Sequence, residues 1–325
     1  MKKLVLIIAA VAFVAATPLM AQTYKPKGNL EFVAPAGAGG GWDLTIRTVA
    51  KILADTKLVT NPMPVTNKVG GGGAVNLTYM QTKKKNDKLI VVYSPPLLLN
   101  NLNGTTPLGY KNTTPLARLI TDYNVFAVNK TSKYQSIAEV MDALKKDPST
   151  VTIGGNSAAG SMDHVSFLVM AKAAGVKEVK SVKYISFQDN AGAAQLMGGH
   201  IDVLVAGLAD IRGLVESGEV RALATTAAAR PATGLASKVP TCRESGIPAD
   251  FFNWRGLFGA PGMPANAVKF WRETLGKMVK TPEWISACEK NGWDLSYADQ
   301  DDFVKFLEQN NSLMKSILVE LGIAK

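Results

Sequence analysis

The residue types best suited to bind a ligand lie in one glycine-rich loop near the N-terminus. The apolar run before this loop predicts a strand, and the amphipathic run after it predicts a helix. The loop reads Ala34-Pro35-Ala36-Gly37-Ala38-Gly39-Gly40-Gly41-Trp42-Asp43. Four of these residues lack a β-carbon, so a ligand can approach the backbone closely. Backbone N–H groups at the start of a helix, together with its positive dipole end, favour a carboxylate or a phosphate.

A second loop of the same kind occurs in the other half of the chain. The run 151–153 predicts a strand, and 162–174 has a helical pattern. Between them the sequence is Gly154-Gly155-Asn156-Ser157-Ala158-Ala159-Gly160-Ser161. Two anion-seeking loops in separate halves predict a clamp around one negatively charged ligand.

The first loop does not match a nucleotide-binding motif. The third glycine of the dinucleotide fingerprint would fall at Trp42, and no Gly-Lys-Ser/Thr follows any glycine run. A tight turn that packs the helix on the strand is the structural alternative. Asp43 either is stabilised by the helix dipole alone, or holds the loop in shape or contacts the ligand. Trp42 either forms a wall of the pocket or packs in the core.

Residue types found in catalytic sites also occur near the second loop. Ser161, Asp163 and His164 are close in sequence, but neighbours on a helix point about 100° apart and cannot form a relay. The run 155–159 nearly matches a nucleophile elbow, so an exported hydrolase using Ser157 stays open as an alternative. The histidines, cysteines and carboxylates form no metal-binding cluster, and we expect neither catalysis nor a cofactor.

The N-terminus predicts export from the cytoplasm. Lys2 and Lys3 precede an apolar run from residue 4 to 16, and Ala21 is a small residue at the expected cleavage point. A membrane anchor is the competing interpretation, although the run is short for a spanning helix. We therefore expect residues 1–21 to be a signal peptide and the mature protein to be periplasmic.

Charge and cysteine content narrow the class of partner. The formal net charge of +10 becomes +8 without the two signal lysines, and the basic residues are scattered. We therefore expect capture of anionic solutes rather than nucleic acid. Cys242 and Cys288 are 46 residues apart (288 minus 242), and whether they pair stays open.

Alternating strand and helix patterns predict an α/β protein with two lobes. Each lobe is expected to be an open, mostly parallel sheet flanked by helices. The C-terminal helices need a sheet to cover, so the chain is expected to return to the first lobe. This gives domain I over 22–122 and 254–325 and domain II over 123–253, with hinge crossings near Tyr123 and Asn253.

Several segments together resemble the substrate-binding receptors of tripartite tricarboxylate transporters, also called Bug proteins. The resemblance covers nearly the whole mature chain. It lies in the first loop with Leu44, Thr45 and Arg47, in 69–75, in the second loop with His164, and in 195–202, 239–246 and 254–261.

That resemblance implies a Venus-flytrap fold, meaning a two-lobed periplasmic binding protein that holds a small di- or tricarboxylate in its cleft and delivers it to a membrane permease. It implies recognition by backbone amides and bridging waters, and we expect a monomer. An amino acid or aromatic carboxylate is the alternative ligand. The sequence departs from many relatives at 69–73 and at 187–190, where Asp189 would disfavour a highly anionic ligand such as citrate. The predicted ligand contacts are Ala36, Gly39, Gly40, Gly41, Trp42, Asp43, Ser94, Asn156, Ser157, Gly160 and Ser161.

Overall fold

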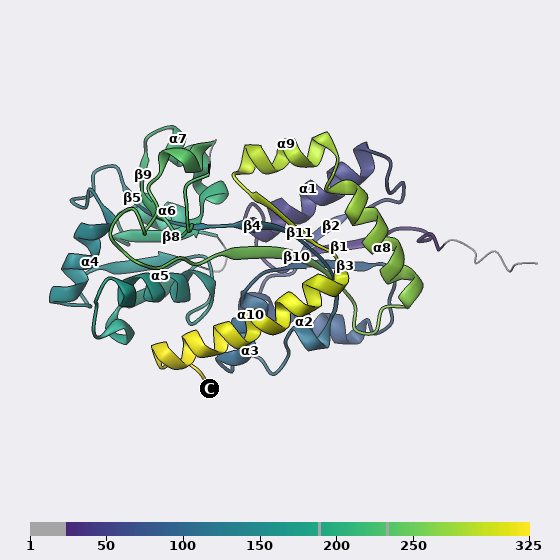
Figure 1. Cartoon of the computed structure of the whole chain (residues 1–325), viewed down its shortest axis with the longest axis horizontal. Helices are drawn as coiled ribbons and strands as arrows, with labels where there is room; N and C mark the ends of the chain where they lie inside the picture. The colour runs from purple at the N-terminus through teal and green to yellow at the C-terminus, as the bar shows by residue number, and fades with distance from the viewer. Residues whose placement is uncertain (1–23, 188–189, 232–233) are drawn as a thin grey trace, which may run out of the picture.

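The computed structural model describes residues 24–187, 190–231 and 234–325 (Figure 1). The predicted signal peptide and Asp189 lie outside the described residues. In the described ranges, the strands form two separate sheets, each flanked by helices, and each sheet is the centre of one lobe. None of the helices in these ranges has the length and apolar content needed to cross a membrane.

Lobe I is built on a sheet with the strand order β11-β4-β10-β3-β1-β2. Strands β2, β1 and β3 pair in parallel, whereas β10 and β11 run antiparallel to their neighbours. The strands are β1 (Glu31–Ala34), β2 (Val65–Asn67), β3 (Leu89–Tyr93), β4 (Thr114–Asp122), β10 (Asn253–Gly259) and β11 (Asp294–Ala298). The helices are α1 (Gly41–Asp55), α2 (Ala74–Thr82), α3 (Pro96–Leu102), α8 (Ala265–Met278) and α9 (Pro282–Asn291), with short 3-10 turns η1 (Gly71–Gly73) and η2 (Tyr110–Asn112).

Lobe II is built on a sheet with the order β7-β6-β8-β5-β9. Strands β7, β6 and β8 pair in parallel, and β5 runs antiparallel to β8 and β9. The strands are β5 (Asn124–Asn129), β6 (Thr152–Gly155), β7 (Lys183–Ser186), β8 (Val203–Gly207) and β9 (Val220–Thr225). The helices are α4 (Ile137–Lys146), α5 (Met162–Ala173), α6 (Gly192–Met197) and α7 (Arg212–Glu216), with η3 (Val179–Ser181), η4 (Leu208–Ile211) and η5 (Leu235–Lys238). Both sheets are therefore mixed, with a parallel half that carries a glycine loop and an antiparallel half that joins the lobes.

The chain crosses between the two sheets at Tyr123, which separates β4 from β5, and again between β9 and β10. The two crossings meet in space, because Asn253 at the start of β10 pairs with Asp122 at the end of β4. We propose domain boundaries at these crossings, as predicted from the sequence. Helix α10 (Gln300–Leu321) also runs beneath both lobes, and an ion pair of 2.8 Å joins Lys172 of α5 to Glu320 (Figure 1).

Three elements differ from the predicted ones. Residues 100–114 are rich in Asn, Gly, Thr and Pro, a composition that predicts a loop, but α3 extends through Leu102 because Pro95 and Pro96 begin a helix. The C-terminal sequence predicts helices over 264–280 and 299–321, and it does not predict helix α9 or strand β11, which lie between them. Strand β11 lies at the edge of its sheet and is only partly buried, so it lacks the apolar pattern that marks an inner strand.

Cys242 and Cys288 are both buried and unpaired.

Candidate ligand-binding site

A pocket of about 100 Å³ lies between the two lobes and is lined by residues from both. Two connections reach it, one in each lobe. We call residues 35–40, between β1 and α1, loop I, and residues 156–161, between β6 and α5, loop II. Both loops follow the carboxyl end of a parallel strand, which is the edge where open α/β sheets place their ligands.

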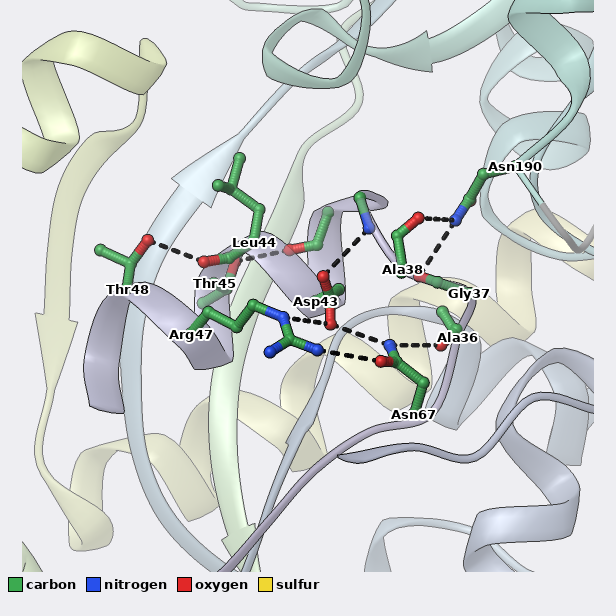
Figure 2. A network of polar contacts seen from close by, with 12 residues as sticks. Ala36, Gly37, Ala38, Asp43, Leu44, Thr45, Arg47, Thr48, Asn67 and Asn190 are labelled. Carbon is green, nitrogen blue, oxygen red and sulfur yellow. Dashed lines mark hydrogen bonds and ion pairs between the residues drawn. The ribbon is translucent and has the colours of Figure 1, made fainter. Parts of the chain in front are cut away.

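Asp43 in the first turn of α1 holds loop I in shape (Figure 2). Its Oδ2 accepts a hydrogen bond of 3.0 Å from the Gly39 amide. Its Oδ1 accepts from Arg47 Nε and from Asn67 Nδ2, both at 2.8 Å, and Asn67 also donates to the Ala36 carbonyl. Burial acts to raise the pKa of Asp43, but these donors outweigh it and keep the pKa below its ordinary value. Asp43 was expected to be stabilised by the helix dipole alone, to hold the loop in shape or to contact the ligand. Its hydrogen bonds fit the second of these roles.

Asp163 performs the same task for loop II. Its Oδ2 accepts from the amides of Asn156 and Ser157 at 2.8 and 2.9 Å, and its Oδ1 accepts from Asn124 Nδ2 at 3.1 Å. The Asp163 amide in turn donates to Ser157 Oγ at 2.8 Å. Burial raises the pKa of Asp163 to about 6 despite these donors. The two lobes thus use one device: an aspartate in the first helical turn that folds back onto its own loop.

His164 supports loop II without contacting Ser157. Its Nδ1 accepts from the Gly160 amide at 2.9 Å, and its ring stacks on Tyr184 with the centroids 4.4 Å apart. Burial lowers the pKa of His164 to about 4, so the ring is neutral at pH 7.

Replacing His164 by Gln should therefore remove an acid sensitivity. In wild type, protons bind His164 in the unfolded chain below pH 6.5 but in the folded chain only near pH 4, so stability falls as the pH drops between these values. Relative to His164→Gln, wild type should lose roughly 2–3 kcal/mol between pH 7 and pH 4.5, measured by urea unfolding. Parallel pH profiles for the two proteins would contradict this assignment.

Trp42 lines the pocket and also packs against the core of lobe I. Its indole Nε1 donates to Ser94 Oγ at 2.8 Å, and its ring meets Tyr93 edge to face with the centroids 5.6 Å apart. Both roles considered for Trp42 are therefore combined. Ser94, which follows β3, lines the same wall.

One asparagine connects each loop to the opposite lobe. Asn190 of lobe II donates to the carbonyls of Gly37 and Ala38 in loop I, at 3.1 and 3.3 Å (Figure 2). Asn103 of lobe I donates to the carbonyl of Gly160 in loop II at 2.9 Å. The structure therefore describes the two lobes closed on each other.

A buried ion pair lies beside the pocket where the chain crosses between lobes. Arg255 on β10 pairs with Asp122 on β4 at 2.6 Å, and each side chain is 2% exposed. A second bond of 3.0 Å runs from Arg255 Nη1 to Thr45 Oγ1 on α1. The guanidinium lies so close to α1 that a β-carbon on Gly41 would come within 2.2 Å of Arg255 Nη2. A side chain at position 41 would therefore displace the Arg255 guanidinium from its buried partners.

The structure brings some of the predicted site residues to the pocket and places others behind it. Those that line it are Gly41, Trp42, Ser94, Asn156, Ser157 and Ser161. Those outside its lining are Ala36, Gly39, Gly40, Asp43 and Gly160. All of these except Gly40 form hydrogen bonds with side chains or through their own side chain that hold the loops in shape. Gly40 faces Asn190 across the lobe boundary, where its β-carbon would lie 2.8 Å from that side chain.

Several lining residues were missed as site residues by sequence reasoning. They are polar groups on β5, η4 and β10, namely Asn124, Asp210, Asn253 and Arg255. Only sheet pairing brings them together, and the sole available signal was a polar or charged residue beside an apolar strand, as in Asn253-Trp254-Arg255.

Two α/β lobes, two chain crossings and a pocket between them define a two-lobed solute-binding protein of the Venus-flytrap class. The model of the tripartite tricarboxylate transporter family receptor matches residues 46–323. The chain therefore belongs to this family, as the sequence resemblance predicted.

Solved structures confirm the fold. Rpa4515 of R. palustris with adipate is 22% identical, with a TM-score of 0.83, over 92% of this chain and 99% of that one. The periplasmic binding protein BugD is 21% identical, with a TM-score of 0.81, over 93% and 100% of the two chains. MatC from Rhodopseudomonas palustris with bound malate is 18% identical, with a TM-score of 0.79, over 90% and 100%. At these identities the likeness establishes a shared fold.

Proposed function

We propose that the protein captures a small dicarboxylate between its lobes and delivers it to the membrane subunits of a tripartite tricarboxylate transporter. The observation that carries this proposal is the pocket enclosed by two helix starts, one from each lobe. Gly41 and Trp42 begin α1, Met162 begins α5, and all three line the pocket. The N-cap residues Gly40 and Ser161 form no side-chain cap bond, although the Asp163 amide of α5 donates to Ser157 Oγ. Two opposed positive helix ends suit a ligand with a carboxylate at each end.

The size of the pocket favours a four-carbon skeleton. One water needs roughly 10–15 Å³ of such space, so a pocket of about 100 Å³ holds roughly seven to ten water-sized groups. A four-carbon dicarboxylate has roughly eight or nine non-hydrogen atoms, whereas citrate has roughly thirteen. We therefore narrow the predicted di- or tricarboxylate class to dicarboxylates. The malate of MatC and the adipate of Rpa4515 are small dicarboxylates bound by proteins of the same fold.

We also propose binding without turnover. The hydroxyl of Ser157 accepts from the Asp163 amide and lies 3.4 Å from the Tyr184 hydroxyl. The Nδ1 of His164 accepts from the Gly160 amide instead, so this atom is not available to take a proton from Ser157. Family membership supports a periplasmic receptor, and we propose that it acts as a monomer.

Calorimetric titration of the mature protein tests this proposal. The panel is succinate, L-malate, L-aspartate, adipate, citrate and an aromatic carboxylate. We expect a four-carbon dicarboxylate to bind most tightly, citrate to bind at least about tenfold more weakly, and no ligand to be consumed. Tightest binding of citrate or of the aromatic acid would contradict the size argument. Ester hydrolysis that disappears in Ser157→Ala would contradict the receptor role.

A further inference from the structure

Three polar residues form a cluster on the pocket wall at the chain crossings, and we call Asn124, Asp210 and Asn253 the acceptor cluster. They are brought together around Gly207 of β8. Asn124 pairs with Gly207 across β5 and β8, and Asn253 pairs with Asp122 across β10 and β4. A β-carbon on Gly207 would lie 3.2 Å from Oδ2 of both Asp122 and Asp210. All three members of the cluster line the pocket.

Each member of the acceptor cluster has an oxygen without a hydrogen-bond partner among the described residues. These atoms are the Oδ1 atoms of Asn124, Asp210 and Asn253, and all are shielded from solvent. Asn124 is 1% exposed and Asn253 8% exposed. The amide of Asn124 cannot be reversed, because its Nδ2 donates to Asp163 Oδ1 and Ser166 Oγ at 3.1 and 2.9 Å. Buried acceptors without partners are rare, because they lower the stability of the folded protein. Donors from a bound molecule would satisfy the acceptor cluster.

The acceptor cluster also carries a carboxylate without a cation of its own. Arg255 is engaged with Asp122 and Thr45, and none of the Lys and Arg residues in the described ranges forms an ion pair with Asp210. Burial raises the pKa of Asp210 to about 7, and the charges of Asp122 and Asp163 add to this effect against that of Arg255. A positively charged group on the ligand would stabilise the ionised Asp210 carboxylate.

We propose that the acceptor cluster receives an ammonium group, so that the ligand is an amino dicarboxylate. This inference rests on the proposed function. An ammonium offers three N–H donors and no acceptor, whereas a hydroxyl offers one donor and an ionised carboxylate none. The unpartnered donors nearby, Ser161 Oγ and Arg255 Nε, remain for a carboxylate of the same ligand.

Three acids with the same four-carbon skeleton test the inference: succinate, L-malate and L-aspartate. In wild type, aspartate should bind about 100-fold more tightly than succinate, because succinate leaves the cluster unpaired. Asp210→Asn should cost aspartate about 100-fold and change succinate by less than about threefold. Asp142→Asn is the matched control, because it removes an exposed carboxylate of α4 in the same lobe and should change neither.

The pH dependence of wild type provides a test that needs no variant. Asp210 must be ionised to hold an ammonium, and Asp122 of β4, Asp163 of α5 and Arg255 of β10 are the charged groups that act on it. With a pKa of about 7, aspartate should bind about tenfold more weakly at pH 6 than at pH 8, and succinate should not.

The outcomes separate this inference from the proposed function. Equal binding of succinate and aspartate by wild type, or an aspartate affinity unchanged in folded Asp210→Asn, would overturn the ammonium site and leave the dicarboxylate receptor standing. No binding of any of the three acids would overturn both the ammonium site and the four-carbon ligand of the proposed function.

Discussion

Arg255→Met should lower the free energy of unfolding by about 3–5 kcal/mol, the largest loss of stability we expect from a single substitution. The change leaves the Asp122 carboxylate buried without its partner, where it was paired at 2.6 Å. Urea unfolding of the ligand-free protein measures the loss. Arg230→Met is the matched control: its pair with Glu244 is exposed on the surface, so the cost should stay below about 1 kcal/mol.

The pH dependence of Arg255→Met should identify the cause. Burial already raises the pKa of Asp122, and removal of Arg255 takes away the opposing charge, so this pKa rises further. A carboxyl whose pKa is higher in the folded than in the unfolded state favours folding at low pH and loses that contribution as the pH rises. The difference in stability between the variant and wild type should therefore be smaller at pH 5 than at pH 7, and Asp122→Asn in the same chain should reduce it at pH 7. A loss that is equal at all pH values, and unaffected by Asp122→Asn, would point to packing alone.

Gly40→Leu should weaken binding of the preferred four-carbon dicarboxylate about 10- to 100-fold while leaving the folded lobes intact. A β-carbon at Gly40 would lie 2.8 Å from the Asn190 side chain, which donates to loop I from the opposite lobe. The backbone of Gly40 is extended, with φ of −77°, so the new residue causes no strain in the chain itself. Overpacking at the lobe boundary costs about 1–3 kcal/mol, and this cost falls on the closed form that holds the ligand.

A second substitution distinguishes blocked closure from a damaged loop. Asn190 has a positive φ of 66°, which glycine adopts readily, so Asn190→Gly removes the side chain without strain. Adding Asn190→Gly to Gly40→Leu should restore part of the affinity by clearing the space. Titration calorimetry measures affinity, and the thermal midpoint of each ligand-free protein controls for folding. An affinity for Gly40→Leu equal to that of wild type would contradict a closed form with loop I against Asn190.

The two loops could be predicted from the sequence because their signals are local. Strand, glycine run and helix follow one another within about fifteen residues, and the first-turn aspartates Asp43 and Asp163 stand where a helix dipole stabilises them. The alternating pattern also predicted two sheets flanked by helices, because buried parallel strands are nearly continuous apolar runs.

The acceptor cluster and Arg255 could not be predicted from local sequence signals. Gly207 meets Asn124 through the pairing of β8 with β5, and Asn253 meets Asp122 through the pairing of β10 with β4. Each pairing joins segments that are far apart in the chain. Arg255 stands inside an apolar strand, where nothing local reveals that its partner is more than a hundred residues away. Contacts between lobes, such as that of Asn103 with Gly160, depend on how the lobes close and have no sequence pattern of their own.

Hydrogen exchange with and without the preferred four-carbon dicarboxylate tests most directly whether both loops hold one ligand. Amides of 35–46 and of 156–166 belong to separate lobes, and in our account one bound molecule joins them. We predict that a saturating ligand slows exchange in both segments at the same ligand concentration, and that Gly40→Leu abolishes both effects together. Protection of only one segment, or of neither while the ligand is bound, would contradict a ligand clamped between the two loops.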